Sequence, residues 1–147
     1  MEDVGTVGAA CVDTDIITDY LRGREPGKSA YAGWREKAEV FITSITAFEL
    51  LLGANLSLKR EERIIEVESL LDQHNILAFA RDSAREAAEK GAELRVKGAM
   101  VDIRDLLNAS ICLSKGIPIL TKNKAHYERI KELIVLTPNQ SPLTTKS

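Results

Sequence analysis

The chain has 147 residues, of which 44% are hydrophobic and 29% are charged. These proportions are typical of globular proteins and exclude a largely disordered chain. The formal net charge of −2 excludes binding to nucleic acid through overall positive charge, because such binding depends on neutralising phosphates. We therefore expect a single domain with its own hydrophobic core, in which any contact with nucleic acid is local.

The one stretch apolar enough to be considered as a membrane span covers residues 40–58, but Glu49 lies in its middle. A buried strand followed by a helix explains this stretch better. No signal-peptide pattern opens the chain, so we expect a cytoplasmic protein without a membrane partner. The two cysteines, Cys11 and Cys112, lack the close spacing of metal or redox motifs, and we expect buried thiols.

Apolar runs in the chain predict strands, and apolar residues at helical spacing predict helices. The predicted elements are, in order, a strand over 9–12, a helix closed by Gly23, a turn at Pro26 and Gly27, a strand over 40–42, helices over 46–53 and 59–73, a strand over 76–80, a helix from its cap at Asp82 to Lys97, a helix over 103–114, a strand over 118–120, a short helix and a strand over 133–136. This alternation predicts an α/β fold.

The predicted fold is a single domain over residues 8–137, with about five parallel strands and helices on both faces of the sheet. Residues 138–147 are rich in Pro, Ser and Thr, which predicts a disordered tail. Parallel sheets of this kind bind ligands at the carboxyl ends of their strands. Functional residues are therefore expected at those ends.

Three acidic residues stand at such positions. Asp13 directly follows the first strand, Glu49 lies in the helix after the second, and Asp105 lies in the first turn of a later helix. Each also has a purely structural interpretation. Asp13 could cap a helix, and Asp105 could be favoured by the helix dipole. Glu49 could form a capping box with Thr46.

Carboxylates that converge in a poorly solvated cleft repel one another, which raises their pKa values or draws in cations. Mg²⁺ and Mn²⁺ prefer oxygen ligands and can promote phosphodiester hydrolysis, and no His/Cys cluster supports zinc. Asn108 shares a helix face with Asp105, and Thr121 and Asn123 follow the fourth strand. Their oxygens are further candidates for this site, although Asn108 could be an ordinary polar residue and Asn123 a helix cap.

Four segments of the chain together resemble a known family. They are Val12-Asp13-Thr14-Asp15-Ile16-Ile17 with Leu21-Arg22-Gly23, then Ser44-Ile45-Thr46-Ala47-Phe48-Glu49-Leu50, then Asp105-Leu106-Leu107-Asn108-Ala109-Ser110, and finally Thr121-Lys122-Asn123 with His126-Tyr127. In order and spacing they look like the successive motifs of PIN-domain endoribonucleases of the VapC toxin type. The resemblance covers nearly the whole chain, and the four motifs together are specific.

The resemblance implies an endoribonuclease that acts on RNA with Mg²⁺ or Mn²⁺. It also implies a homodimer and inhibition by a small VapB-type antitoxin whose tail enters the acidic pocket. By motif position, Asp13, Glu49 and Asp105 would be the catalytic and metal-binding acids, and Thr14 would support the first of them.

The chain departs from the family pattern at three positions. Asn123 stands where many members have a fourth aspartate, so the resemblance makes it a further candidate ligand and leaves the number of metal ions open. Asp15 stands where the family often has Asn, and Asn108 stands where an apolar residue is usual. None of these departures changes the three acids.

Four basic residues flank the predicted pocket by motif position and could guide a phosphate backbone: Arg22, Arg24, Lys122 and Lys124. Ordinary solvated side chains remain the alternative for the two lysines. Two other functions also stay open. Asp13 and Asp15 could be the nucleophile and acid of a haloacid-dehalogenase-like phosphatase, or the acids could hold a cation in a catalytically silent binding module.

Overall fold

The computed structural model describes residues 8–142, and its centre is a parallel β-sheet. The strands are β1 (Ala9–Val12), β2 (Glu39–Thr43), β3 (Asn75–Leu77), β4 (Ile119–Leu120) and β5 (Val135–Leu136). They are arranged in the order β3-β2-β1-β4-β5, and every neighbouring pair is parallel. The predicted α/β fold with a five-stranded parallel sheet is confirmed.

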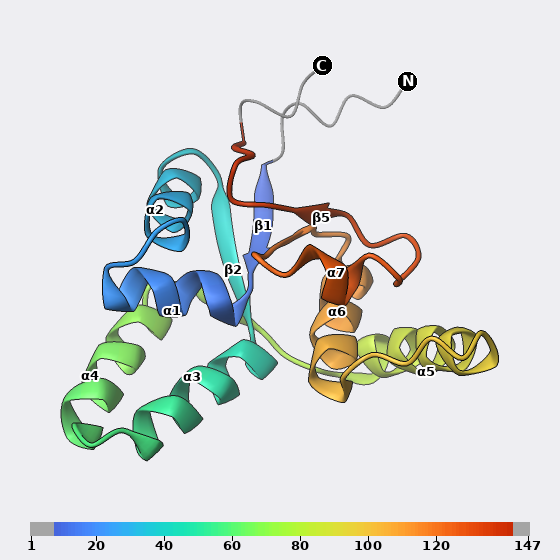
Figure 1. Ribbon diagram of the computed structural model, residues 1–147, viewed down its shortest axis with the longest axis horizontal. Helices are drawn as coiled ribbons and strands as arrows, with labels where there is room; N and C mark the ends of the chain where they lie inside the picture. The colour runs from blue at the N-terminus through green and yellow to red at the C-terminus, as the bar shows by residue number, and fades with distance from the viewer. Residues whose placement is uncertain (1–7, 143–147) are drawn as a thin grey trace.

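Helices cover both faces of the sheet. They are α1 (Thr14–Arg22), α2 (Gly27–Lys37), α3 (Ser44–Leu56), α4 (Arg60–Leu71), α5 (Arg81–Val96), α6 (Ile103–Lys115) and α7 (Lys124–Tyr127). Helices α1 to α4 lie on one side of β1 and β2, whereas α5 and α6 lie on the other (Figure 1). Among residues 8–142, none of these helices combines the length and the apolar character that a membrane span requires.

Successive side chains of β1 enter two different cores. Ala10 and Val12 pack in the core beside α1 to α4, and Cys11 packs in the core beside α5 and α6. Side chains alternate between the two faces along a strand, so a strand covered on both faces is apolar throughout. Cys112 lies in the same core as Cys11, and both are free, buried thiols as expected.

Helix α2 was missed by the sequence analysis, which predicted only a turn at its start. Its buried residues Gly27, Ala30, Tyr31 and Trp34 stand at i, i+3, i+4 and i+7, which is helical spacing and was an available signal. The glycines at 27 and 33 lower the local helix propensity. Packing of Tyr31 and Trp34 in the core beside α1 to α4 stabilises the helix.

Several predicted boundaries were shifted because the caps lie elsewhere. Helix α3 begins at Ser44, since the Thr43 hydroxyl accepts a hydrogen bond from the Thr46 amide at 3.1 Å. Helix α5 is preceded by Ala80 rather than by Asp82 as the capping residue. Strand β3 ends at Leu77, before the predicted end of that strand, and β5 is also shorter than predicted. The predicted closure of α1 at Gly23 is confirmed.

The predicted tail covers residues 138–147, of which 143–147 lie outside the described residues. In the part that the structure describes, the Gln140 carbonyl accepts a hydrogen bond from Trp34 Nε1 at 3.1 Å. This contact attaches the start of the segment to α2. The boundary between domain and tail at residue 137 stays a prediction.

Replacing Gly27 with Ala should destabilise the fold by about 2 kcal/mol or more, because an added Cβ overpacks the junction of α1 and α2. That Cβ would lie 2.4 Å from Asp19 Cβ and 2.8 Å from the Ile16 carbonyl oxygen. Gly33 of the same helix has no such neighbour within 4 Å, so Gly33→Ala should stabilise by roughly 0.5–1 kcal/mol. Urea unfolding measures both changes, and equal effects of the two substitutions would contradict this account.

Candidate active site

A cleft of about 480 Å³ lies beside the carboxyl end of β1, and the three predicted acids line it. Asp13 follows β1, Glu49 belongs to α3, which follows β2, and Asp105 belongs to α6. Figure 1 shows the starts of α1 and α3 at the ends of these two strands, with α6 beside them. The parallel sheet therefore brings together side chains that are far apart in the sequence.

Asp13 is almost fully buried, with 7% of its surface exposed. Its Oδ1 accepts hydrogen bonds from the Thr14 amide at 2.8 Å and from Asn108 Nδ2 at 3.3 Å, and its Oδ2 accepts one from Thr121 Oγ1 at 2.8 Å. It thus caps α1, as the structural interpretation predicted, and also lines the cleft. Its role as a metal-binding acid stays a prediction. Burial, assisted by repulsion from Asp15, raises the pKa of Asp13 to about 7.

Glu49 does not form the predicted capping box, because Thr43 rather than Thr46 caps α3. Its Oε1 accepts a hydrogen bond from Thr14 Oγ1 at 2.5 Å, and its Oε2 lies 3.5 Å from Arg104 Nη1. Since the Thr14 amide donates to Asp13, Thr14 contacts two of the three acids.

Asp105 lies in the first turn of α6, whose N-cap is Asp102. The Asp105 carboxylate accepts a hydrogen bond from the Tyr127 hydroxyl at 3.3 Å and lies 3.4 Å from His126 Nδ1. Burial raises the pKa of Asp105, and the negative charges of Asp102 and Glu49 add to that rise. The repulsion indicates that these acids are close enough to influence one another.

Asn108 lies beneath the cleft rather than in it. Its side chain is buried, its Oδ1 accepts a hydrogen bond from Thr43 Oγ1 at 2.5 Å, and its Nδ2 donates to Asp13 and to the Tyr127 hydroxyl. The polar residue in an otherwise apolar motif therefore connects Asp13 to β2 and α7. It contacts one acid directly and a second, Asp105, through Tyr127.

Asp15 stands beside Asp13 in the cleft. Its Oδ2 accepts hydrogen bonds from the Lys122 amide at 3.1 Å and from Asn123 Nδ2 at 2.8 Å. Its Oδ1 is buried and has no hydrogen-bond partner among the described residues. Burial raises the pKa of Asp15. Asn123 is the N-cap residue of α7, as one alternative predicted, although its side chain makes no capping hydrogen bond and its Nδ2 donates to Asp15 instead. Its oxygen as a metal ligand stays a prediction.

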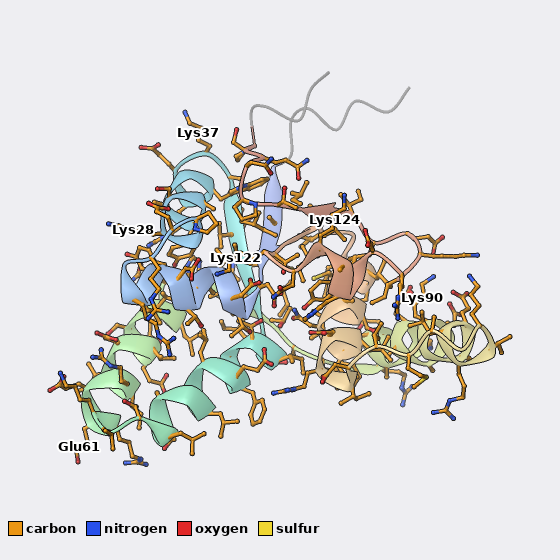
Figure 2. All side chains as sticks on the ribbon, viewed as in Figure 1. Lys28, Lys37, Glu61, Lys90, Lys122 and Lys124 are labelled. Atoms are coloured by element: carbon orange, nitrogen blue, oxygen red, sulfur yellow. The ribbon has the colours of Figure 1, made fainter. Side chains whose placement is uncertain are left out.

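Three of the four predicted RNA-binding residues line the cleft, namely Arg22, Arg24 and Lys122. Lys122 Nζ lies 2.9 Å from Asp19 Oδ2, which places this side chain beside α1 (Figure 2). Lys124 is exposed on α7 and does not itself line the cleft, although Asn123 and His126 on either side of it do (Figure 2). Its contact with RNA stays a prediction.

Several side chains of this site were not predicted from the sequence, among them Arg104 and Tyr127. Arg104 lines the cleft together with Asp102 and Asp105. Tyr127 contacts both Asp105 and Asn108. Tyr127 belongs to the fourth motif, so its place in that motif was an available signal. Arg104 had no such signal, because its contact with Glu49 depends on the packing of α3 against α6.

Comparison with known proteins gives the family. The PIN domain model matches residues 10–133, most of the chain. The chain belongs to the PIN domain family. Ribonuclease VapC from Rickettsia bellii is 30% identical over 129 residues, which cover 86% of this chain and 93% of that protein. Ribonuclease VapC1 from Methanocaldococcus jannaschii is 28% identical over 127 residues, or 82% of this chain and 80% of that protein.

A solved structure agrees with this family assignment. The DNA-bound VapBC structure from Salmonella typhimurium superposes with a TM-score of 0.78 and 25% identity, covering 90% of this chain and 99% of that chain. The predicted resemblance to VapC-type PIN domains is thereby confirmed. It also favours a nuclease over the haloacid-dehalogenase-like phosphatase that the sequence had left open.

A second groove opens beside the cleft of this PIN domain. It has a volume of about 490 Å³, and residues of α1, α3 and α4 line it. The groove and the cleft share Thr18, Arg22 and Glu49, so they are continuous around these side chains.

Proposed function

We propose that this protein is an endoribonuclease that hydrolyses RNA phosphodiester bonds with a bound Mg²⁺ or Mn²⁺ ion, and that it is the toxin of a VapBC-type toxin–antitoxin pair. The observation that carries the proposal is the cleft in a PIN fold that is lined by Asp13, Glu49 and Asp105. The relatives named ribonuclease VapC support it. An RNA substrate would place the activity in the cytoplasm.

The residues of the cleft fit a divalent cation. Burial holds the pKa values of Asp13, Asp15 and Asp105 above their usual range, and Asp15 Oδ1 is buried without a hydrogen-bond donor among the described residues. The positive charge of a cation would lower these pKa values and would give Asp15 Oδ1 a partner. Oxygen donors of this kind suit Mg²⁺ or Mn²⁺.

The site is open rather than a closed cage. Within residues 8–142, no three His, Cys, Asp or Glu side chains form a group that could by itself hold a metal ion. This agrees with Mg²⁺ chemistry, in which one or two carboxylates bind the ion together with water and substrate phosphates. Asp13, with Glu49, Asp105 and Asp15 around the same cleft, would hold the ion.

A bound divalent cation can polarise a phosphoryl oxygen and lower the pKa of a coordinated water. The chain's own residues set the geometry around it. Thr121 and Asn108 orient the two oxygens of Asp13, Tyr127 orients Asp105, and Thr14 orients Glu49. Arg22 and Arg24 at the rim would attract the phosphate backbone despite the negative net charge of the chain.

Removal of divalent cations should abolish RNA cleavage, and added Mg²⁺ or Mn²⁺ should restore it. Purified protein is treated with EDTA, dialysed, and assayed on end-labelled single-stranded RNA with each ion. The Asp105→Asn variant should stay inactive with either ion while keeping its circular dichroism spectrum. Cleavage that persists in EDTA would disprove metal dependence. Cation binding without cleavage of any RNA would favour the silent binding module.

The partner that we infer is a VapB-type antitoxin, and we also infer that the chain forms a homodimer. The similar solved structure is a VapBC assembly, and the groove beside α1, α3 and α4 opens into the cleft, so a peptide tail could reach the acids along it. In the cleavage assay, the antitoxin should stop RNA hydrolysis at equimolar concentration. Size-exclusion chromatography with light scattering tests the dimer, and a monomeric mass would refute it.

A further inference from the structure

Arg104 is a cation placed among the acids of the cleft. It lies in the first turn of α6, and 52% of its side chain is exposed. Its Nε lies 3.5 Å from Asp102 Oδ1, and its Nη1 lies 3.5 Å from Glu49 Oε2. The guanidinium therefore bridges α6 and α3 across the cleft.

Glu49 is engaged at both of its oxygens. Oε1 accepts the hydrogen bond from Thr14 Oγ1, and Oε2 faces Arg104. A divalent cation that approaches Glu49 meets the positive charge of this guanidinium at short range. Because two cations beside one carboxylate repel each other, occupation of the site by a metal ion opposes the contact between Arg104 and Glu49.

Asp102 keeps Arg104 at the cleft even without Glu49. As the N-cap of α6, Asp102 Oδ1 accepts a hydrogen bond from the Arg104 amide at 2.8 Å, which fixes this carboxylate 3.5 Å from Arg104 Nε. A guanidinium released from Glu49 therefore stays at the rim. Its planar array of N–H donors matches the oxygens of a phosphodiester, to which arginine can donate two hydrogen bonds at once.

We propose that Arg104 has two alternating partners: it neutralises Glu49 when the cleft holds no metal ion, and it binds the RNA phosphate backbone when a metal ion takes its place. The part of this inference that concerns RNA rests on the proposed function, whereas the competition with a cation does not. Arg104 is thus both a competitor of the metal ion and a substrate-binding residue.

Arg104→Gln tests both parts, because it removes the charge and keeps a polar side chain. Without RNA, the variant should bind Mn²⁺ about threefold more tightly by isothermal titration calorimetry, the size expected for a half-exposed ion pair. With RNA, its KM should rise about tenfold, the effect of losing a charged hydrogen bond, with a smaller change in kcat. If Arg104 had only a structural role, its loss would not strengthen Mn²⁺ binding while it raises the KM for RNA.

Two further variants complete the experiment. Arg95→Gln, at an exposed position of α5, changes the net charge equally and should alter neither Mn²⁺ affinity nor KM. Arg104→Lys keeps the charge but loses the planar array of donors, so it should bind Mn²⁺ like the natural protein and still show a raised KM. If Arg104→Gln fails to fold, Arg104→Lys still tests the phosphate contact.

Unchanged or weaker Mn²⁺ binding by a folded Arg104→Gln variant would overturn the competition. Unchanged KM in both Arg104 variants would overturn the phosphate contact. Should the natural protein cleave no RNA at all, the proposed function fails, and the Mn²⁺ titration still decides whether Arg104 competes with the cation.

Discussion

The Asp13→Asn variant is expected to cleave RNA on the order of a thousandfold more slowly than the natural protein. Loss of a residue that only orients a metal ligand typically lowers activity about 10- to 100-fold, and loss of a proposed ligand should exceed this. An asparagine can still accept the hydrogen bonds from the Thr14 amide and from Asn108. The fold should therefore survive, and single-turnover cleavage of labelled RNA measures the loss.

Asp72→Asn is the matched control for this substitution. Asp72 is exposed at the end of α4, does not line the cleft, and loses the same charge when replaced. The control should cleave RNA at the rate of the natural protein. Comparable activity of Asp13→Asn, in a preparation free of other nucleases, would remove Asp13 from the mechanism.

The same Asp13→Asn variant should be more stable than the natural protein at pH 8 when no metal is present. Burial, together with Asp15, raises the pKa of Asp13 from 3.8 to about 7. The ionised carboxylate is therefore disfavoured in the folded state, and the difference corresponds to about 4 kcal/mol of unfolding free energy. Asparagine carries no charge and avoids this cost.

The stability gain should grow with pH in a defined range. Below pH 3.8 the Asp13 carboxyl is protonated in both states, and the two proteins should differ little. As the pH rises towards about 7, only the unfolded state ionises fully, so the natural protein loses stability relative to the variant. Urea unfolding in EDTA at several pH values across this range measures the difference.

Added Mg²⁺ at pH 8 should narrow this difference in stability, by about 2.7 kcal/mol at a Mg²⁺ concentration 100 times its dissociation constant. A cation that binds the folded natural protein stabilises it by mass action, and the Asp13→Asn variant should gain much less. Asp72→Asn, exposed at the end of α4, should show no comparable dependence on pH or Mg²⁺. A variant that is less stable than the natural protein at every pH without metal would contradict the effect assigned to burial.

The positions of Asp13 and Asp105 could be predicted because their signals are local. An apolar run ends directly before Asp13, and Asp105 stands in the first turn of a helix that Gly116 closes. Alternating strands and helices then require a parallel sheet, whose strand ends face one edge. These steps need no knowledge of contacts between distant residues.

Other features were mispredicted where tertiary packing competes with local pattern. Helix α2 was not predicted although Ala30, Tyr31 and Trp34 stand at helical spacing, because its two glycines lower the local helix propensity. The packing of Tyr31 and Trp34 in the core stabilises it. The pair Thr46 and Glu49 has the spacing of a capping box, but the backbone turns into the helix at Thr43 instead. A motif of two residues cannot specify where the preceding strand ends.

The sequence by itself determined the order of the elements other than α2, the α/β class and the three acids at the edge of the sheet, because these follow from hydrophobic periodicity and from residues next to one another. Only the tertiary structure decided which polar groups meet: Arg104 with Glu49, and Asp15 with Asn123. Those contacts join α3 to α6 and α1 to the end of β4. They depend on distances set by the packing of whole helices against the sheet, which no local pattern encodes.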